Sequence, residues 1–188
     1  PEDAPTVPLR PGCEVAQRTE ALGDGSAWTF TRNGCGASPS GPRLFVAGDS
    51  HATAYIALLR QYAMKTGTEV RVYQVPGCRF FGLGSARELD APHCLPAMHA
   101  AMDDIGRRAR EGDMLFLPSL RLERFSDQWV AFDRNEVIAR NASAAQATRD
   151  EGIARARERL LPLDRRGVRV VFEAPPPDLP QAPSSEAA

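Results

Sequence analysis

Apolar residues along this chain form short continuous runs that alternate with longer segments of helical spacing. The first continuous run predicts a buried strand over residues 43–47. In the segment that follows, apolar residues recur at helical intervals up to Gly67. This spacing predicts a helix over residues 51–66, which the glycine would end.

The same alternation repeats toward the carboxyl end of the chain. It predicts, in order, a strand over 69–75, a helix over 95–111, a strand over 114–117, a helix over 141–166 and a strand over 168–172. Strands that alternate with helices imply right-handed crossovers and a parallel sheet. The expected fold class is therefore α/β: a three-layer α/β/α sandwich with a parallel, flavodoxin-like sheet.

The regions on either side of this pattern are rich in Pro, Gly and Ser. Residues 1–40 are predicted to be a linker and an irregular extension tied by a disulfide, in which residues 28–30 form a short strand or a hydrophobic plug. The α/β domain is expected over residues 41–177, and residues 178–188 are expected to be a disordered tail. Because neither an initiator Met nor a signal peptide opens the chain, we expect a piece of a longer protein.

Composition narrows the class of protein. A net charge of −1 over 188 residues gives no reason to expect nucleic acid or a membrane surface as a partner. No apolar run approaches the length of about 20 residues that a membrane-spanning helix needs. The cysteine spacings do not suggest a zinc site, so no metal is expected.

The four cysteines permit two disulfides with three possible connectivities. We expect local pairing, Cys13 with Cys35 and Cys78 with Cys94. These pairs close the shorter loops, and each brackets a Gly- and Pro-rich stretch that would otherwise be loosely held. The alternative is four buried free thiols in a cytosolic protein.

Ser50 lies at the predicted turn between the first strand and the first helix, after Gly48 and Asp49. Backbone N–H groups at the start of a helix have no intrahelical partner and lie at the positive end of the helix dipole. Such donors suit a developing oxyanion, so Ser50 is a candidate nucleophile. Asp and Ser are also ordinary helix N-caps, and a well-capped turn is the alternative interpretation.

This serine belongs to a longer motif. Residues 43–55, Arg-Leu-Phe-Val-Ala-Gly-Asp-Ser-His-Ala-Thr-Ala-Tyr, resemble the first sequence block of the SGNH (GDSL-type) esterase and acyltransferase superfamily. The histidine after the serine makes the chain most similar to the periplasmic SGNH domain of bacterial acyltransferase family 3 proteins. Residues 75–78, Cys94 and residues 170–175 fit that subfamily too, and the resemblance covers about residues 43–177.

The resemblance implies the SGNH fold and O-acetylation of a cell-envelope glycan such as the O-antigen of lipopolysaccharide. Ser50 would receive an acyl group from an N-terminal transmembrane acyltransferase domain of the same protein, and a sugar hydroxyl would accept it. The implied location is the periplasm, tethered to the bacterial inner membrane, with no cofactor beyond the acyl donor. Two alternatives stay open: a secreted SGNH carbohydrate esterase, and a non-catalytic glycan-binding or structural module.

The oxyanion residues of the family match this chain less well. The family's oxyanion glycine corresponds to Gly77 or Gly82. Its oxyanion asparagine falls in a loop where this chain has Ser119 and Arg121 instead. Gly77 and Ser119 are therefore the candidates for the oxyanion hole.

The family's acid and base, an Asp-x-x-His near the C-terminus, has no counterpart at that place. The same spacing occurs at Asp90 and His93, which are weak acid and base candidates because we interpret their spacing as a coincidence. His51 points away from Ser50, as consecutive helical residues do, and His99 lies within a helix beside an apolar stripe. We therefore expect the base and its carboxylate beyond residue 188, and the chain alone to be at best a very weak esterase.

Overall fold

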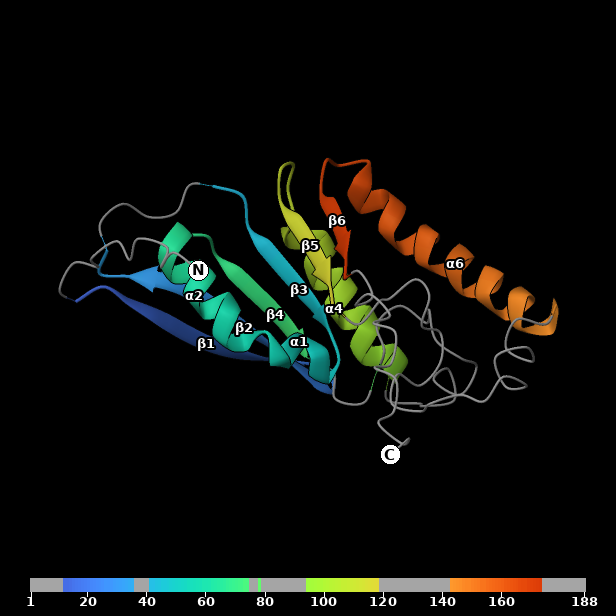
Figure 1. The fold of residues 1–188 in the computed structure, drawn as a ribbon, viewed down its shortest axis with the longest axis horizontal. Helices are drawn as coiled ribbons and strands as arrows, with labels where there is room; N and C mark the ends of the chain where they lie inside the picture. Colours follow the sequence, from blue (N-terminus) through green and yellow to red (C-terminus); the bar gives the residue numbers. More distant parts are fainter. Residues whose placement is uncertain (1–11, 36–40, 75–77, 79–93, 119–142, 174–188) are drawn as a thin grey trace, which may run out of the picture.

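The computed structural model describes residues 12–35, 41–74, 78, 94–118 and 143–173. Its centre is a six-stranded sheet with the order β1-β2-β4-β3-β5-β6, so that β1 and β6 are the two edges (Figure 1). The strands are β1 Glu14–Leu22, β2 Gly25–Asn33, β3 Leu44–Gly48, β4 Val70–Gln74, β5 Met114–Leu117 and β6 Arg169–Phe172. The helices are α1 Ser50–Ala54, α2 Ile56–Thr66, α4 Cys94–Arg108 and α6 Ser143–Asp164.

Four strands of this sheet form the predicted parallel core. β3 pairs in parallel with β4 on one side and with β5 on the other, and β5 pairs in parallel with β6. Along the chain, β3 is the first of these parallel strands, β4 the second, β5 the third and β6 the fourth. In the sheet they lie in the order β4-β3-β5-β6, which is the order second, first, third, fourth of flavodoxin-like sheets. The predicted α/β fold class is confirmed.

Apolar clusters lie on both faces of the sheet, as the three-layer prediction requires. Because successive strand residues point to opposite faces, Phe45 and Val46 belong to different clusters. Phe45 packs with buried residues of α4 and α6. Val46 packs with Leu59 and Ala63 of α2. The crossovers from β4 to β5 and from β5 to β6 therefore place α4 and α6 on one face of the sheet. The crossover from β3 to β4 places α2 on the other face.

The predicted first helix is interrupted at Tyr55. α1 ends at Ala54 and α2 begins at Ile56, with Tyr55 between them at φ −85° and ψ −2°. No side-chain hydrogen bond caps the start of α2 at this residue, and the Tyr55 side chain contacts other elements of the fold. α2 ends as predicted at Gly67, which has the left-handed φ of 73° that favours glycine.

The N-terminal region is not irregular over residues 14–33, and here the prediction was wrong, although residues 28–30 do belong to a strand, as one of the two expectations for them had it. β1 and β2 form an antiparallel hairpin, and β2 continues the sheet by pairing antiparallel with β4. Ala27 and Phe30 of β2 are fully buried. The alternation of apolar residues is hidden in the sequence because Thr29, only 6% exposed, places a polar side chain in the interior.

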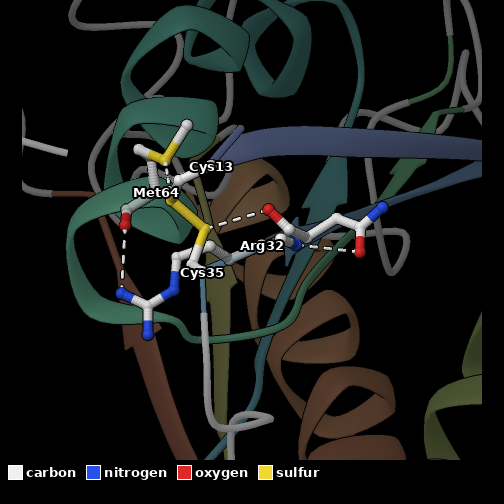
Figure 2. The surroundings of a disulfide bond; sticks show 6 residues. Cys13, Arg32, Cys35 and Met64 are labelled. Carbon is white, nitrogen blue, oxygen red and sulfur yellow. Dashed lines mark hydrogen bonds between the residues drawn. A yellow bond between two sulfur atoms is a disulfide. The ribbon is translucent and has the colours of Figure 1, made fainter. Parts of the chain in front are cut away.

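Both predicted disulfides are present. Cys13–Cys35 closes the open end of the β1–β2 hairpin, and its Cys13 Sγ lies 3.7 Å from the Sδ of Met64 near the end of α2 (Figure 2). Cys78–Cys94 joins the region after β4 to the first residue of α4. Its two residues are 0% and 3% exposed, so this disulfide belongs to the apolar core, whereas Cys13–Cys35 is only half-buried.

A buried polar network connects the hairpin, the parallel strands and α4. Arg71 of β4 is its centre, 2% exposed, and donates to Asp104 Oδ2 at 2.9 Å and to Thr29 Oγ1 at 2.7 Å. It also forms an ion pair with Glu20 of β1, at 2.7 Å. The Tyr73 hydroxyl donates to the same Asp104 oxygen at 2.9 Å. Every charge of this network is thus paired, which a buried charge requires.

The network shifts the pKa values of its members. Burial of Asp104 opposes ionisation, but hydrogen bonds from Tyr73 and Arg108 and the nearby arginine charges outweigh burial and lower its pKa. A hydrogen bond from Arg71 is the main cause of the lowered pKa of Glu20. Burial raises the pKa of the Tyr73 phenol above its ordinary value. Both carboxylates are therefore ionised at neutral pH.

Within the described residues, none of the helices has the length and apolar character needed to cross a membrane.

Candidate functional site

Ser50 is the first residue of α1 and lies directly beyond the carboxyl end of β3. β3 is an interior strand with β4 and β5 on either side, and residues 45–48 are buried. Asp49 forms the turn, and its carbonyl accepts a hydrogen bond from the N–H of Ala52 at 3.1 Å. The backbone of Ser50 is thus at the edge where open α/β sheets place their ligand sites, as predicted.

The strands beside β3 end at the same edge. Gly48 is in register with Gln74 at the end of β4, and Val46 is in register with Phe116 of β5. Gly77 and Ser119 follow β4 and β5 in the sequence, but both lie outside the described residues, as do Gly82 and Arg121. Their assignment to an oxyanion hole stays a prediction.

The candidate acid and base, Asp90 and His93, also lie outside the described residues. His99 is exposed on α4, where its ring nitrogens lie 3.1 and 3.2 Å from the guanidinium of Arg159 on α6. α4 covers the face of the sheet opposite to α2. Its contact with Arg159 therefore makes His99 a link between two helices rather than a partner for Ser50.

A contact that the sequence did not predict joins the α1 region to β6. The hydroxyl of Tyr55 donates to Oε1 of Glu173 at 2.8 Å, across a separation of 118 residues. The ring of Tyr55 packs edge-on against Phe116 of β5, with 5.6 Å between ring centroids and an interplanar angle of 79°. The one available signal was Glu173 itself, an acidic residue directly after the last strand, where ligand sites of parallel sheets lie.

The amino ends of the parallel strands, opposite to the ends near Ser50, carry a structural ion pair. Asp113, just before β5, accepts hydrogen bonds from the backbone N–H of Arg43 at 2.7 Å and from its guanidinium at 2.9 Å. These bonds fix the amino ends of β3 and β5 relative to each other. Asp113 and Arg43 are therefore part of the scaffold, away from the edge that carries Ser50.

Among the described residues, no three His, Cys, Asp or Glu side chains gather closely enough to hold a metal ion.

Comparison with solved structures finds low similarity to esterases and hydrolases. A thermostable esterase from Pseudomonas putida ECU1011 is 12% identical with a TM-score of 0.34, and the match covers 90% of this chain and 74% of the esterase. LAE6, an α/β hydrolase enzyme from the metagenome of Lake Arreo, Spain, is 12% identical with a TM-score of 0.35, covering 86% of this chain and 73% of the hydrolase. Similarity at this level supports no argument about the function of this chain.

No curated protein matches the chain. The family comparison is specific by contrast: the sequence model described as "SGNH domain (fused to AT3 domains)" matches residues 13–188. This span includes the hairpin, the parallel sheet and the turn that carries Ser50. The chain therefore belongs to the family of SGNH domains that are fused to acyltransferase 3 domains.

Proposed function

We propose that this domain transfers an acyl group, through an acyl-serine at Ser50, to a hydroxyl of a cell-envelope glycan. The observation that carries the proposal is the position of Ser50 in a chain of the SGNH family. It begins α1 just beyond the carboxyl end of the interior strand β3, where open α/β sheets generally place their ligand sites. The backbone of this serine directly follows a buried strand, which holds it in place.

The proposed reaction has two steps. In the first, Ser50 Oγ attacks the carbonyl carbon of the acyl donor, a base takes the serine proton, and the donor's leaving group departs with a proton. In the second, a sugar hydroxyl attacks the acyl-serine, its proton passes to the base, and the serine oxygen is released and reprotonated. Gly77 and Ser119 are candidates to hydrogen-bond the oxyanion in both steps. Asp90 and His93 are weak candidates for the acid and base.

The proposed location is the periplasm, with the acyl group, acetyl in the simplest case, supplied by a membrane acyltransferase domain of the same protein. Two observations support this. The family is defined by its fusion to acyltransferase 3 domains. The two disulfides are typical of proteins that function in an oxidising compartment, whereas cytosolic thiols are kept reduced.

Acetylation of the glycan in cells tests the proposed function. Ser50→Ala in the full-length protein is expected to abolish it while the protein remains folded, because even the complete loss of a helix cap costs only about 1 kcal/mol. Ser143→Ala makes the same change at the first residue of α6 and serves as the matched control, with normal acetylation expected. Normal acetylation by Ser50→Ala would reject the nucleophile, and loss in both variants would show that the effect is not specific to Ser50.

A further inference from the structure

Tyr55 connects three elements at the carboxyl ends of the parallel strands. It is the single residue between α1 and α2, its ring contacts Phe116 of β5, and its hydroxyl binds Glu173 just after β6. α1 itself follows β3 directly. The side chain of Tyr55 thus links α1, which begins at Ser50, to β5 and to the end of β6.

α1 depends on such links because it is short. A helix of five residues barely exceeds one turn, and a single turn is not stable in isolation. Its orientation must come from its flanks and from its own buried contacts. On one flank it continues from β3, and within it Ala52 is fully buried against α2 and the sheet. On the other flank, Tyr55 is the residue that is fixed by a long-range hydrogen bond.

The hydrogen bond and the ring contact act in different directions. The edge-on contact with Phe116 sets how deeply the ring enters the layer between α2 and the sheet. The bond to Glu173 sets where the ring lies along the carboxyl ends of the strands, because Glu173 directly follows β6, which is held in the sheet by its pairing with β5. Removing the hydroxyl alone keeps the first contact and loses the second, so the two roles can be separated.

We propose that Tyr55 is a positioning residue, which through its hydrogen bond to Glu173 holds α1, and with it Ser50, in line with the carboxyl ends of β5 and β6. The inference rests on the proposed function, because it assigns Ser50 the role of nucleophile. Reaction rates respond steeply to the placement of a nucleophile, and a displacement of about 1 Å can cost about a hundredfold in rate. A bond of modest strength at this point therefore has an effect on rate that exceeds its effect on stability.

The test uses the full-length protein with p-nitrophenyl acetate as the acyl donor, and measures kcat, KM, thermal stability and amide hydrogen exchange of residues 51–54. Tyr55→Phe is expected to lower kcat by about tenfold to about a hundredfold, with KM and melting temperature nearly unchanged and with faster exchange in α1. Glu173→Ala is expected to do the same. Glu173→Gln keeps an oxygen acceptor and is expected to retain most of the wild-type kcat. Tyr62→Phe, the same change at an exposed tyrosine of α2, is the matched control.

The double variant Tyr55→Phe/Glu173→Ala decides whether the two residues act together. If one bond carries the effect, the double variant is expected to be no slower than either single variant. Wild-type kcat and wild-type exchange in Tyr55→Phe would overturn the proposal, as would losses that multiply in the double variant.

The variant Ser50→Ala separates this inference from the proposed function. If Ser50→Ala retains full turnover, the nucleophile is wrong, and the exchange of residues 51–54 in Tyr55→Phe still decides whether Tyr55 holds α1. If Ser50→Ala is inactive while Tyr55→Phe is fully active, the nucleophile stands and the positioning role is rejected.

Discussion

Arg71 is a charged residue enclosed in the core, and its partners come from several elements of the fold. Asp104 lies on α4, Thr29 on β2 and Glu20 on β1. A buried ion pair of this kind contributes little net stability when intact, because desolvation offsets the attraction. Losing one partner is costly, because the other charge stays buried without compensation.

Asp104→Ala is therefore expected to lower the free energy of unfolding by about 3–5 kcal/mol, measured by urea denaturation. Asp103→Ala is the matched control, since Asp103 is the adjacent residue of α4 and its side chain is exposed. We expect this control to change the free energy of unfolding by less than about 0.5 kcal/mol. Equal effects of the two substitutions would contradict the assignment of Asp104 as the partner of Arg71.

The lowered pKa values of Asp104 and Glu20 predict how stability depends on pH. A carboxyl whose pKa is lower in the folded state stabilises the protein fully above its unfolded pKa, about 4, and loses that contribution as pH falls through the folded pKa. The free energy of unfolding is expected to fall as pH decreases below about 4. Asp104→Asn, which cannot titrate at this position, is expected to show a smaller fall. An identical pH profile in this variant would show that Asp104 does not contribute.

At the scale of elements, the parallel core follows from the sequence and the hairpin does not. Continuous apolar runs such as that of β5, Met114–Leu117, predicted buried strands at the observed positions. The full length of β2 was not predicted, because its buried Thr29 accepts a hydrogen bond from Arg71, a residue 42 positions away. No local sequence pattern indicates such a partner. The break between α1 and α2 at Tyr55 was not predicted either, because the hydrogen-bond partner of Tyr55, Glu173, lies 118 residues away.

In the candidate site, too, features with a local sequence signal were predictable, and features that depend on long-range contacts were not. A strand followed by Gly48, Asp49 and Ser50 is a local signal, and the structure places Ser50 at the predicted edge. The disulfide pairs were also predictable, because each closes a short loop. The link between Tyr55 and Glu173 arises from tertiary packing alone, so periodicity and spacing could not reveal it.

The hairpin is expected to be a required part of the domain rather than an appendage. Its β2 strand covers the edge of β4 and buries Ala27 and Phe30 completely. A chain that begins at residue 41 would expose this edge and leave Arg71 without Glu20 and Thr29. We expect such a chain to lose its cooperative thermal transition by circular dichroism, or to aggregate. A truncated chain that melts cooperatively near the temperature of the intact chain would show that the hairpin is dispensable.

At the scale of the whole molecule, one sheet serves two purposes. Its β1–β2–β4 side is a scaffold, closed by the Cys13–Cys35 disulfide and the network around Arg71. Its β3–β5–β6 side carries the edge where Ser50 and the contact between Tyr55 and Glu173 lie. The family match over residues 13–188 extends over both sides of the sheet.

The acyl-serine is the central claim, and mass spectrometry of the working protein tests it most directly. The full-length protein is supplied with acyl donor in membranes that lack the glycan acceptor, quenched with acid and digested. The account predicts an acyl group on the peptide that contains Ser50, its absence in Ser50→Ala, and its loss when acceptor glycan is added. Glycan acetylation that proceeds with no acyl group ever found at Ser50, and equally well in Ser50→Ala, would contradict it.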